Sequence, residues 1–274
     1  MKLPLVFAAA MLASACDVQV GENGLSVDIA HGRAKDEWVR TYTLPATGTL
    51  EIVNVNGLIE ATPSDGGQIE VRAEREIRTS SEEQSKALLQ KLQMREEVSP
   101  DRVRIEAQGN PEGGLGGLTS RGQLSVAYHV RVPAGLTVSF KTDNGGVRLE
   151  NLSGRITAST TNGGINGRGL SGGVTADVVN GGVQLDFTSV GGDVRVSTTN
   201  GGVRIDVPAG VKATLDATCV NGGIDVDERL MLQAAETSRR RVTGTLNGGG
   251  PRISAQTVNG GIRIRTRGAT PETE

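Results

Sequence analysis

Hydrophobic and polar residues alternate in short runs through the second half of the chain, and glycines separate the runs. Alternation with a period of two predicts β-strands with one buried and one exposed face. Most runs flank an Asn-Gly-Gly triplet, and the triplets begin at Asn144, Asn162, Asn180, Asn200, Asn221, Asn247 and Asn259. The first five are 18, 18, 20 and 21 residues apart, whereas Asn247 is out of phase. The pattern predicts a repeat of two short strands joined at an Asn-Gly-Gly corner.

The repeats match position by position when they are aligned on the asparagine, with Asn247 left aside. Hydrophobic residues or threonine stand six, four and two residues before it and, with one exception, three and five residues after it. In the first repeat these are Val138, Phe140, Thr142, Val147 and Leu149. The fourth residue after the asparagine is polar in every repeat: Arg148, Asn166, Gln184, Arg204, Asp225 and Arg263.

Two architectures fit this pattern. Asn-Gly between alternating strands is a strong hairpin signal and would give an antiparallel meander. In a β-solenoid, by contrast, each repeat is one coil, and equivalent residues stack on the coils above and below. We favour the solenoid, because near-constant repeat length and matching positions are needed for stacking and not for a meander. The predicted fold is all-β: a parallel β-solenoid, or β-helix, of about 18–21-residue coils, with like side chains about 4.8 Å apart.

The first half of the chain carries weaker versions of the same signals. Residues 48–59 resemble an earlier, degenerate coil, and the segments 68–78 and 102–107 also alternate. Between them, a leucine stripe predicts one helix at about 81–94, in an N-terminal insertion. Ser80 and Glu83 have the spacing of a capping box at its start. We expect this helix to cover an end of the solenoid, and a partner-binding groove is the alternative.

The N-terminus has the features of an export signal. Lys2 precedes an uncharged, mostly apolar stretch of 13 residues, 3–15. A spanning helix needs about 20 residues, whereas the hydrophobic region of a signal peptide is this short. Residues 12–16, Leu-Ala-Ser-Ala-Cys, resemble the bacterial lipobox, in which the cysteine becomes lipid-modified. We therefore expect lipidation at Cys16 and a membrane anchor; soluble export after cleavage at Ala15 is the alternative.

The predicted organisation has one main repeat domain. The expected segments are a signal peptide at 1–15, an N-terminal linker at 16–41, an N-terminal β region at 42–136, the Asn-Gly-Gly solenoid at 137–266 and a tail at 267–274, with residues 228–250 inserted within the solenoid.

The amino-acid composition argues against several classes of function. The chain has 274 residues, 39 of them glycine, and a net charge of −2, which argues against nucleic-acid binding driven by bulk positive charge. Aromatic residues make up 2%, which disfavours platforms that stack bases or sugars. His31 and His129 are the only histidines, so a histidine-rich metal site is excluded. No cofactor is expected.

Taken together, these features resemble a bacterial putative-adhesin family, a domain of unknown function. The resemblance covers about residues 42–265 and rests on Val132-Pro-Ala-Gly135, the repeated Thr-x-Asn-Gly-Gly units and the terminal Thr-Val-Asn-Gly-Gly-Ile-Arg-Ile. It implies a glycine-rich β-solenoid that is exported or attached to the envelope. It implies no catalytic residue, because the family has none established.

One set of residues could carry chemistry. Six residues after the asparagine, two repeats have Arg168 and Arg265, and four repeats have acidic side chains that would form a stripe: Glu150, Asp186, Asp206 and Asp227. A Ca²⁺ ion would relieve their repulsion, but so would arginine, and Arg148 and Arg204 are placed to neutralise Glu150 and Asp206. Paired carboxylates would also suit a polysaccharide-cleaving enzyme. We predict neither a metal site nor catalysis, and we interpret Cys219 as a small core residue.

The sequence therefore predicts an exported cell-envelope protein, located at the periplasmic face of a membrane, with a non-catalytic solenoid and an adhesive or structural role. Its expected partners are the membrane and envelope polymers, proteins or copies of itself. A ladder of corner asparagines is its predicted structural feature: Asn144, Asn162, Asn180, Asn200, Asn221 and Asn259. The alternatives are a carbohydrate-active β-helix enzyme and an accessory or sensor subunit of envelope regulation.

Overall fold

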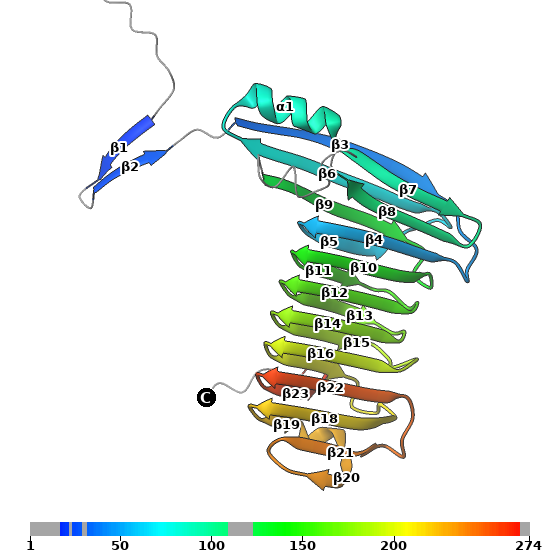
Figure 1. Cartoon of the computed structure of the whole chain (residues 1–274). Coiled ribbons are helices and arrows are strands. Elements are labelled where there is room, and N and C mark those ends of the chain that lie inside the picture. Colours follow the sequence, from blue (N-terminus) through cyan, green and yellow to red (C-terminus); the bar gives the residue numbers. More distant parts are fainter. Residues whose placement is uncertain (1–16, 22–23, 29–31, 109–122, 269–274) are drawn as a thin grey trace, which may run out of the picture.

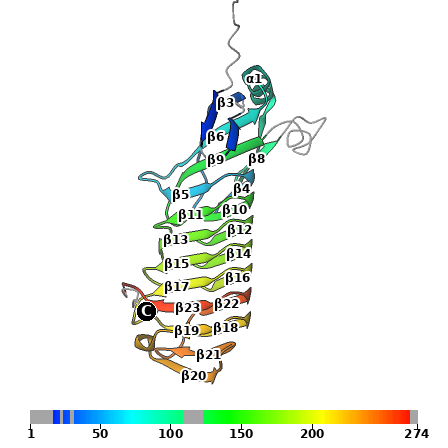
Figure 2. The same cartoon turned by 90° about the vertical axis from the view of Figure 1, so that its left-hand side faces the viewer.

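Two long β-sheets face each other along most of the chain in the computed structural model, which describes residues 17–21, 24–28, 32–108 and 123–268 (Figure 1). One sheet has 11 strands in the order β20-β21-β18-β22-β16-β14-β12-β10-β4-β8-β7. The other has 10 strands in the order β19-β23-β17-β15-β13-β11-β5-β9-β6-β3. In Figure 2 the two sheets lie side by side along the length of the molecule.

The elements follow one another along the chain with these bounds: β1 Asp17–Gly21, β2 Gly24–Asp28, β3 Gly32–Tyr42, β4 Thr49–Asn56, β5 Ile59–Pro63, β6 Ile69–Thr79, α1 Glu82–Lys91, β7 Gln93–Ser99, β8 Arg102–Gln108, β9 Gln123–Val132, β10 Thr137–Asn144, β11 Val147–Glu150, β12 Ile156–Asn162, β13 Ile165–Leu170, β14 Val174–Asn180, β15 Val183–Phe187, β16 Val194–Asn200, β17 Val203–Val207, β18 Ala213–Asn221, β19 Ile224–Val226, the 3₁₀ turn η1 Glu228–Leu230, β20 Leu232–Thr237, β21 Arg241–Leu246, β22 Arg252–Asn259 and β23 Ile262–Thr266.

Each repeat forms one coil, with its first strand in the 11-stranded sheet and its second strand in the 10-stranded sheet. Strands of successive coils pair in parallel and in register; Val138 of β10 lies opposite Ile156 of β12, and Ile156 lies opposite Val174 of β14. The degenerate coil of β4 and β5 pairs in the same way with β10 and β11. Parallel pairing confirms the solenoid and rules out the antiparallel meander for these repeats.

The interior is a thin layer of the inward-facing side chains predicted by the alternation. Val138, Ile156 and their equivalents are buried, and the largest fully buried side chains are Tyr128, Phe140 and Phe187. The threonines two residues before the corner are also buried, and their hydroxyls are hydrogen-bonded to backbone carbonyls. The Oγ1 atom of Thr160 donates to the carbonyl oxygen of Gly145 on the neighbouring coil at 2.8 Å, which satisfies the buried polar atom.

The corners stack so closely that only glycine fits at the first position after the asparagine. A Cβ atom added to Gly163 would lie 2.0 Å from the carbonyl oxygen of Gly145, and Gly163 itself has a φ of 149°. Except on the outermost coil, the amide of each such glycine hydrogen-bonds to a corner on the next coil; Gly163 donates to the carbonyl oxygen of Asn180 at 3.0 Å. The sequence requirement for glycine therefore follows from the approach of two backbones.

At one end of the stack, β6 pairs with both β3 and β9 in antiparallel fashion, and α1 packs against β3 and β6 (Figure 1). The helix covers an end of the solenoid, but its predicted start was wrong by one residue. Ser81, not Ser80, is the N-cap: its backbone is extended, and its Oγ accepts a hydrogen bond from the amide of Gln84. The helix also ends at Lys91, three residues before the predicted end, because the chain enters β7 at Gln93.

Two flanking segments have more structure than expected. The predicted linker at 16–41 contains β1 and β2, which pair with each other, and most of β3. The predicted tail at 267–274 begins with Arg267, whose amide donates to the carbonyl oxygen of Val207 and whose guanidinium pairs with Asp186. The predicted signal peptide at 1–15 and Cys16 lie outside the described residues.

The largest departure from the prediction is the order of the last two coils. The final coil, β22 and β23, does not stack at the end of the solenoid. It lies between the coil of β16 and β17 and the coil of β18 and β19, in both sheets. The inserted segment 228–250 explains this order, since β21 pairs antiparallel with the outer edge of β18 and leaves only the inner edge for β22.

Over the part of the chain that the structure describes, no helix has the length and apolar character needed to cross a membrane.

Candidate functional site

The corner asparagines form a continuous ladder of side-chain amides along one edge of the solenoid. In six of the seven, Nδ2 donates to the Oδ1 of the asparagine on the adjacent coil, at distances of 2.7–3.0 Å, and the Nδ2 of Asn56, at the end of the ladder, donates to the carbonyl oxygen of Leu124. The members of this asparagine ladder, in spatial order, are Asn56, Asn144, Asn162, Asn180, Asn200, Asn259 and Asn221. Because the amides bond mainly to one another, the ladder stabilises the stack.

The predicted acidic stripe is broken by basic partners. Asp186 and Asp206 do lie opposite each other on β15 and β17. Asp206 accepts hydrogen bonds from Nε of Arg204 at 2.8 and 3.0 Å, as the sequence predicted, while Asp186 accepts from the amide of Gly169 and from Nε of Arg267. Both carboxylates are thus held in ion pairs.

Asp227, at the end of the predicted stripe, has a structural position. It caps η1 and accepts hydrogen bonds from Arg229 and from the backbone amide of Thr266 on the final coil. The hydrogen bonds from Arg229, with those from Thr266, hold the pKa of Asp227 well below its usual range. Asp227 therefore connects the cap to the end of β23.

Glu150 lies opposite Arg168 in the pairing of β11 and β13, and the alignment of the repeats places these two residues at the same position. The ion pairs of the described residues do not include the expected one between Arg148 and Glu150. Within the ranges that the structure describes, no three acidic, histidine or cysteine side chains come together as metal ligands would. The four acidic residues therefore do not form one site.

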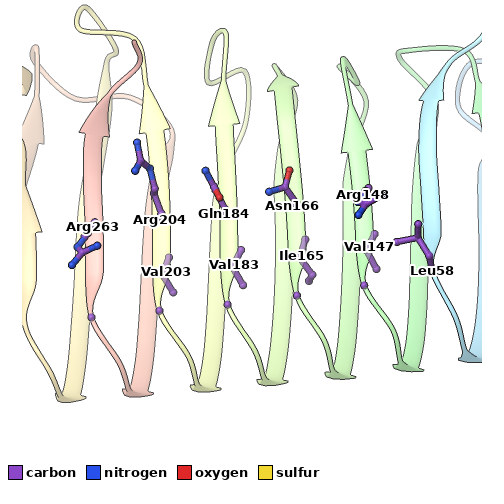
Figure 3. A pocket seen from close by; sticks show the side chains of 15 residues that line it. Leu58, Val147, Arg148, Ile165, Asn166, Val183, Gln184, Val203, Arg204 and Arg263 are labelled. Carbon is purple, nitrogen blue, oxygen red and sulfur yellow. The ribbon is translucent and has the colours of Figure 1, made fainter. Parts of the chain in front are cut away.

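A shallow groove of about 750 Å³ runs across five parallel strands of the 10-stranded sheet, β11, β13, β15, β17 and β23, next to the corners. The second glycine of several corners contributes to its lining, which leaves the surface low beside the polar side chains. Figure 3 shows these side chains in one row on successive strands: Arg148, Asn166, Gln184, Arg204 and Arg263, with Leu58 at one end. None of the described residues that line the groove is acidic.

The alignment of the repeats identifies the polar residues of this row, but it does not predict the order in which they stack. In the chain, Asp225 falls between Arg204 and Arg263, so simple stacking would place a carboxylate between the two guanidinium groups. Because the final coil enters between β17 and β19, Arg263 lies opposite Arg204, and Asp225 is displaced to the outermost strand, where it pairs with Arg265. No signal in the alternation indicates this exchange; only the long interval between Asn221 and Asn259 leaves room for it.

The guanidinium groups of the groove differ in their bonding. Arg204 is held by Asp206, whose carboxylate raises the pKa of the Arg204 side chain. Arg148 and Arg263 are exposed and have no ion-pair or hydrogen-bond partner among the described residues. The groove thus combines one fixed and two unpaired cations with two side-chain amides.

The remaining sequence candidates lie apart from the groove. Cys219 is a free, buried cysteine in the row otherwise occupied by threonine and valine, with its Sγ 3.7 Å from the carbonyl oxygen of Arg239. His129 lies 3.0 Å from a carboxylate oxygen of Glu60 on the neighbouring strand. His31 is outside the described residues.

Comparison with known families gives one match, the family described as Toastrack DUF4097, over residues 114–265. No curated protein matches the chain. The matched segment runs from before β9 to the penultimate residue of β23, and so includes nearly all of the Asn-Gly-Gly solenoid.

Three solved structures align with most of the chain but share little sequence with it. A putative cell adhesion protein from Clostridium sporogenes is 12% identical, with a TM-score of 0.45, and the alignment covers 85% of this chain and 100% of that one. A putative adhesin from Bacteroides fragilis is 13% identical, with a TM-score of 0.32 and coverage of 85% and 98%. A putative adhesin from Parabacteroides distasonis is 10% identical, with a TM-score of 0.32 and coverage of 84% and 97%.

Proposed function

The chain belongs to the Toastrack DUF4097 family, and we propose that it is a non-catalytic protein of the bacterial cell envelope. It is exported, anchored through lipid on Cys16 at the periplasmic face of a membrane, and presents its solenoid as a regular surface for adhesion. A single acyl chain gives marginal membrane binding, whereas the several chains of a bacterial lipoprotein give a stable anchor.

The observation that carries this proposal is the regular spacing of outward polar side chains on a rigid body. Parallel, in-register strands place one side chain of each row about every 4.8 Å, and the buried interior fixes the strands that carry them. Such rows suit weak contacts that repeat along a partner, because the total affinity then grows with the number of contacts.

The bonding of the acidic residues supports a role without catalysis. A glycoside hydrolase needs one carboxyl group that holds a proton and a second that is free to act as base or nucleophile. Asp186, Asp206 and Asp227 each accept hydrogen bonds from an arginine instead. We expect no cleavage of a polysaccharide panel; cleavage that disappears in Asp206→Asn would overturn this part of the proposal.

The anchor is tested by expressing the full chain in a Gram-negative bacterium and analysing the mature N-terminus by mass spectrometry. We expect Cys16 as the first residue with a diacylglycerol on its sulfur, and the protein in the membrane fraction. Cys16→Ser removes the attachment site and should abolish the modification.

Cys219→Ser is the matched control, because Cys219 lies in the core of the solenoid, and it should keep the lipid and the membrane location. An unmodified mature N-terminus, or a chain that keeps residues 1–15 and stays in the cytoplasm, would contradict the anchor.

A further inference from the structure

We propose that the groove across the 10-stranded sheet binds a linear acidic polysaccharide, a chain of carboxylate-bearing sugars such as uronates, that runs along the solenoid axis over Arg148, Arg204 and Arg263. This inference rests on the proposed envelope role and names the class of polymer that the surface would meet there.

The polar side chains of the groove are donors suited to carboxylates and hydroxyls. Guanidinium groups bind carboxylates through two parallel hydrogen bonds, and amide side chains donate to and accept from hydroxyl groups. Arg148 and Arg263 are exposed and have no partner among the described residues, so they can bind a ligand without first breaking an ion pair. No acidic residue lines the groove. Among the carboxylates near it, that of Asp206 is paired with Arg204. That of Asp225, which lies opposite Arg263, is paired with Arg265.

The spacing of the row favours a polysaccharide over an acidic peptide. Adjacent coils are about 4.8 Å apart, which is close to the length of one pyranose unit in an extended chain. Side chains on one face of an extended peptide recur only about every 6.6–6.8 Å, so they drift out of step with the row. A peptide gains main-chain hydrogen bonds by joining a free sheet edge, but the strands of the groove are already paired on both sides, as β15 is with β13 and β17.

The chemistry of the lining also favours charged over neutral sugars. Neutral sugars are commonly held by stacking on aromatic rings, and the groove has none. Attraction must therefore come from charge and hydrogen bonds. From Arg148 to Arg263 the row spans five strands, or about 19 Å at about 4.8 Å per interval, which is enough for several sugar units to bind at once.

The test is isothermal titration of the mature full-length chain, purified in detergent, with a linear oligogalacturonate long enough to span the groove. We expect binding that weakens as salt increases, because the contacts are between charges. The methyl-esterified form of the same oligomer has the same backbone without the charge and should bind at least about tenfold more weakly.

The variant Arg148→Gln/Arg263→Gln removes the two unpaired cations of the groove. We expect it to weaken oligogalacturonate binding by at least about tenfold. The control Arg155→Gln/Arg195→Gln removes the same charge at two exposed arginines outside the groove lining, one on a turn and one on the opposite sheet, and should bind as the parent does. Unchanged thermal unfolding of both variants verifies that the fold is retained.

Three results would overturn the inference. The first is no binding of oligogalacturonate by the folded chain. The second is an equal loss of affinity in the groove variant and in the control variant. The third is binding of poly-glutamate as tight as that of oligogalacturonate. None of these depends on the lipid anchor. If the chain carries lipid on Cys16 but does not bind oligogalacturonate, the proposed envelope role stands and only the proposed ligand is wrong.

Discussion

Asparagine and glycine stand side by side at every corner but stabilise the stack in different ways. The asparagine side chain bonds to the same side chain on the next coil, whereas the first glycine allows the two backbones to approach. The sequence predicted a tight corner from Asn-Gly-Gly alone. It could not distinguish which glycine is essential, because that depends on the carbonyl of a neighbouring coil.

Gly163→Ala should therefore destabilise the protein strongly, by about 3 kcal/mol, because its new Cβ would overlap the backbone of Gly145 and its φ is positive. Gly223→Ala is the control: it alters the second glycine of a corner where a Cβ atom would meet nothing within 4 Å. Urea unfolding of the two variants measures the difference. Equal stability of Gly163→Ala and the parent would show that the corners do not stack this closely.

A cluster of charges at the other end of the molecule gives a prediction that depends on pH. Glu76 on β6 contacts three cations, Arg33, Lys35 and Arg78, and its side chain is only 16% exposed. The hydrogen bond from Arg33, with those from Lys35 and Arg78, lowers the pKa of Glu76 from 4.5 to about 2. A lowered folded pKa stabilises the protein above the unfolded value, and the stabilisation is lost as pH falls from about 4.5 towards 2.

Glu76→Gln should thus lower the free energy of unfolding by about 1–2 kcal/mol at pH 7, after allowance for solvent screening of its exposed partners. The difference from the parent should shrink as the pH falls towards 2, since the parent carboxylate is then protonated. Denaturant unfolding at several pH values measures it. A difference that stays constant down to the lowest pH would contradict the ion-pair explanation.

At the scale of elements, the helix shows what periodicity can and cannot predict. Leu89 and Leu92 are buried, as the leucine stripe indicated, so the existence and the inward face of the helix were predictable. Its ends were not, because Ser80 and Ser81 are both good caps by type, and Leu92 is buried equally well at the start of an extended segment. The choice is made by β6 and β7, which fix where the chain leaves and re-enters the sheets.

Ser81→Ala should cost about 1 kcal/mol of stability, since it removes the oxygen that accepts from the amide of Gln84. Ser80→Ala should cost clearly less, because the Ser80 hydroxyl bonds to the exposed side chain of Gln84 rather than to a helix amide. Thermal unfolding of the two variants compares the sites. A larger loss of stability for Ser80→Ala than for Ser81→Ala would show that Ser80 is the N-cap, as the sequence predicted.

At the scale of the whole molecule, the architecture followed from repeat length and alternation, but the order of the coils did not. Like residues of any two coils can pair, so the sequence is equally compatible with either order for the last two. The hairpin of β20 and β21 decides it by occupying the outer edge of β18. The same exchange brings Arg204 and Arg263 together and so completes the groove.

Disulfide trapping tests this exchange most directly, in a chain whose own cysteines are replaced by Cys16→Ser and Cys219→Thr. Ser197 lies opposite Gln256, and Gln256 lies opposite Thr218, so Ser197 and Thr218 are two strands apart. A disulfide needs Cα atoms within about 7 Å, which adjacent strands satisfy and strands two apart do not. Oxidation followed by peptide mass analysis should therefore give a disulfide in Ser197→Cys/Gln256→Cys and none in Ser197→Cys/Thr218→Cys. The reverse result would mean that the coils stack in chain order, with Asp225 between the two arginines of the groove.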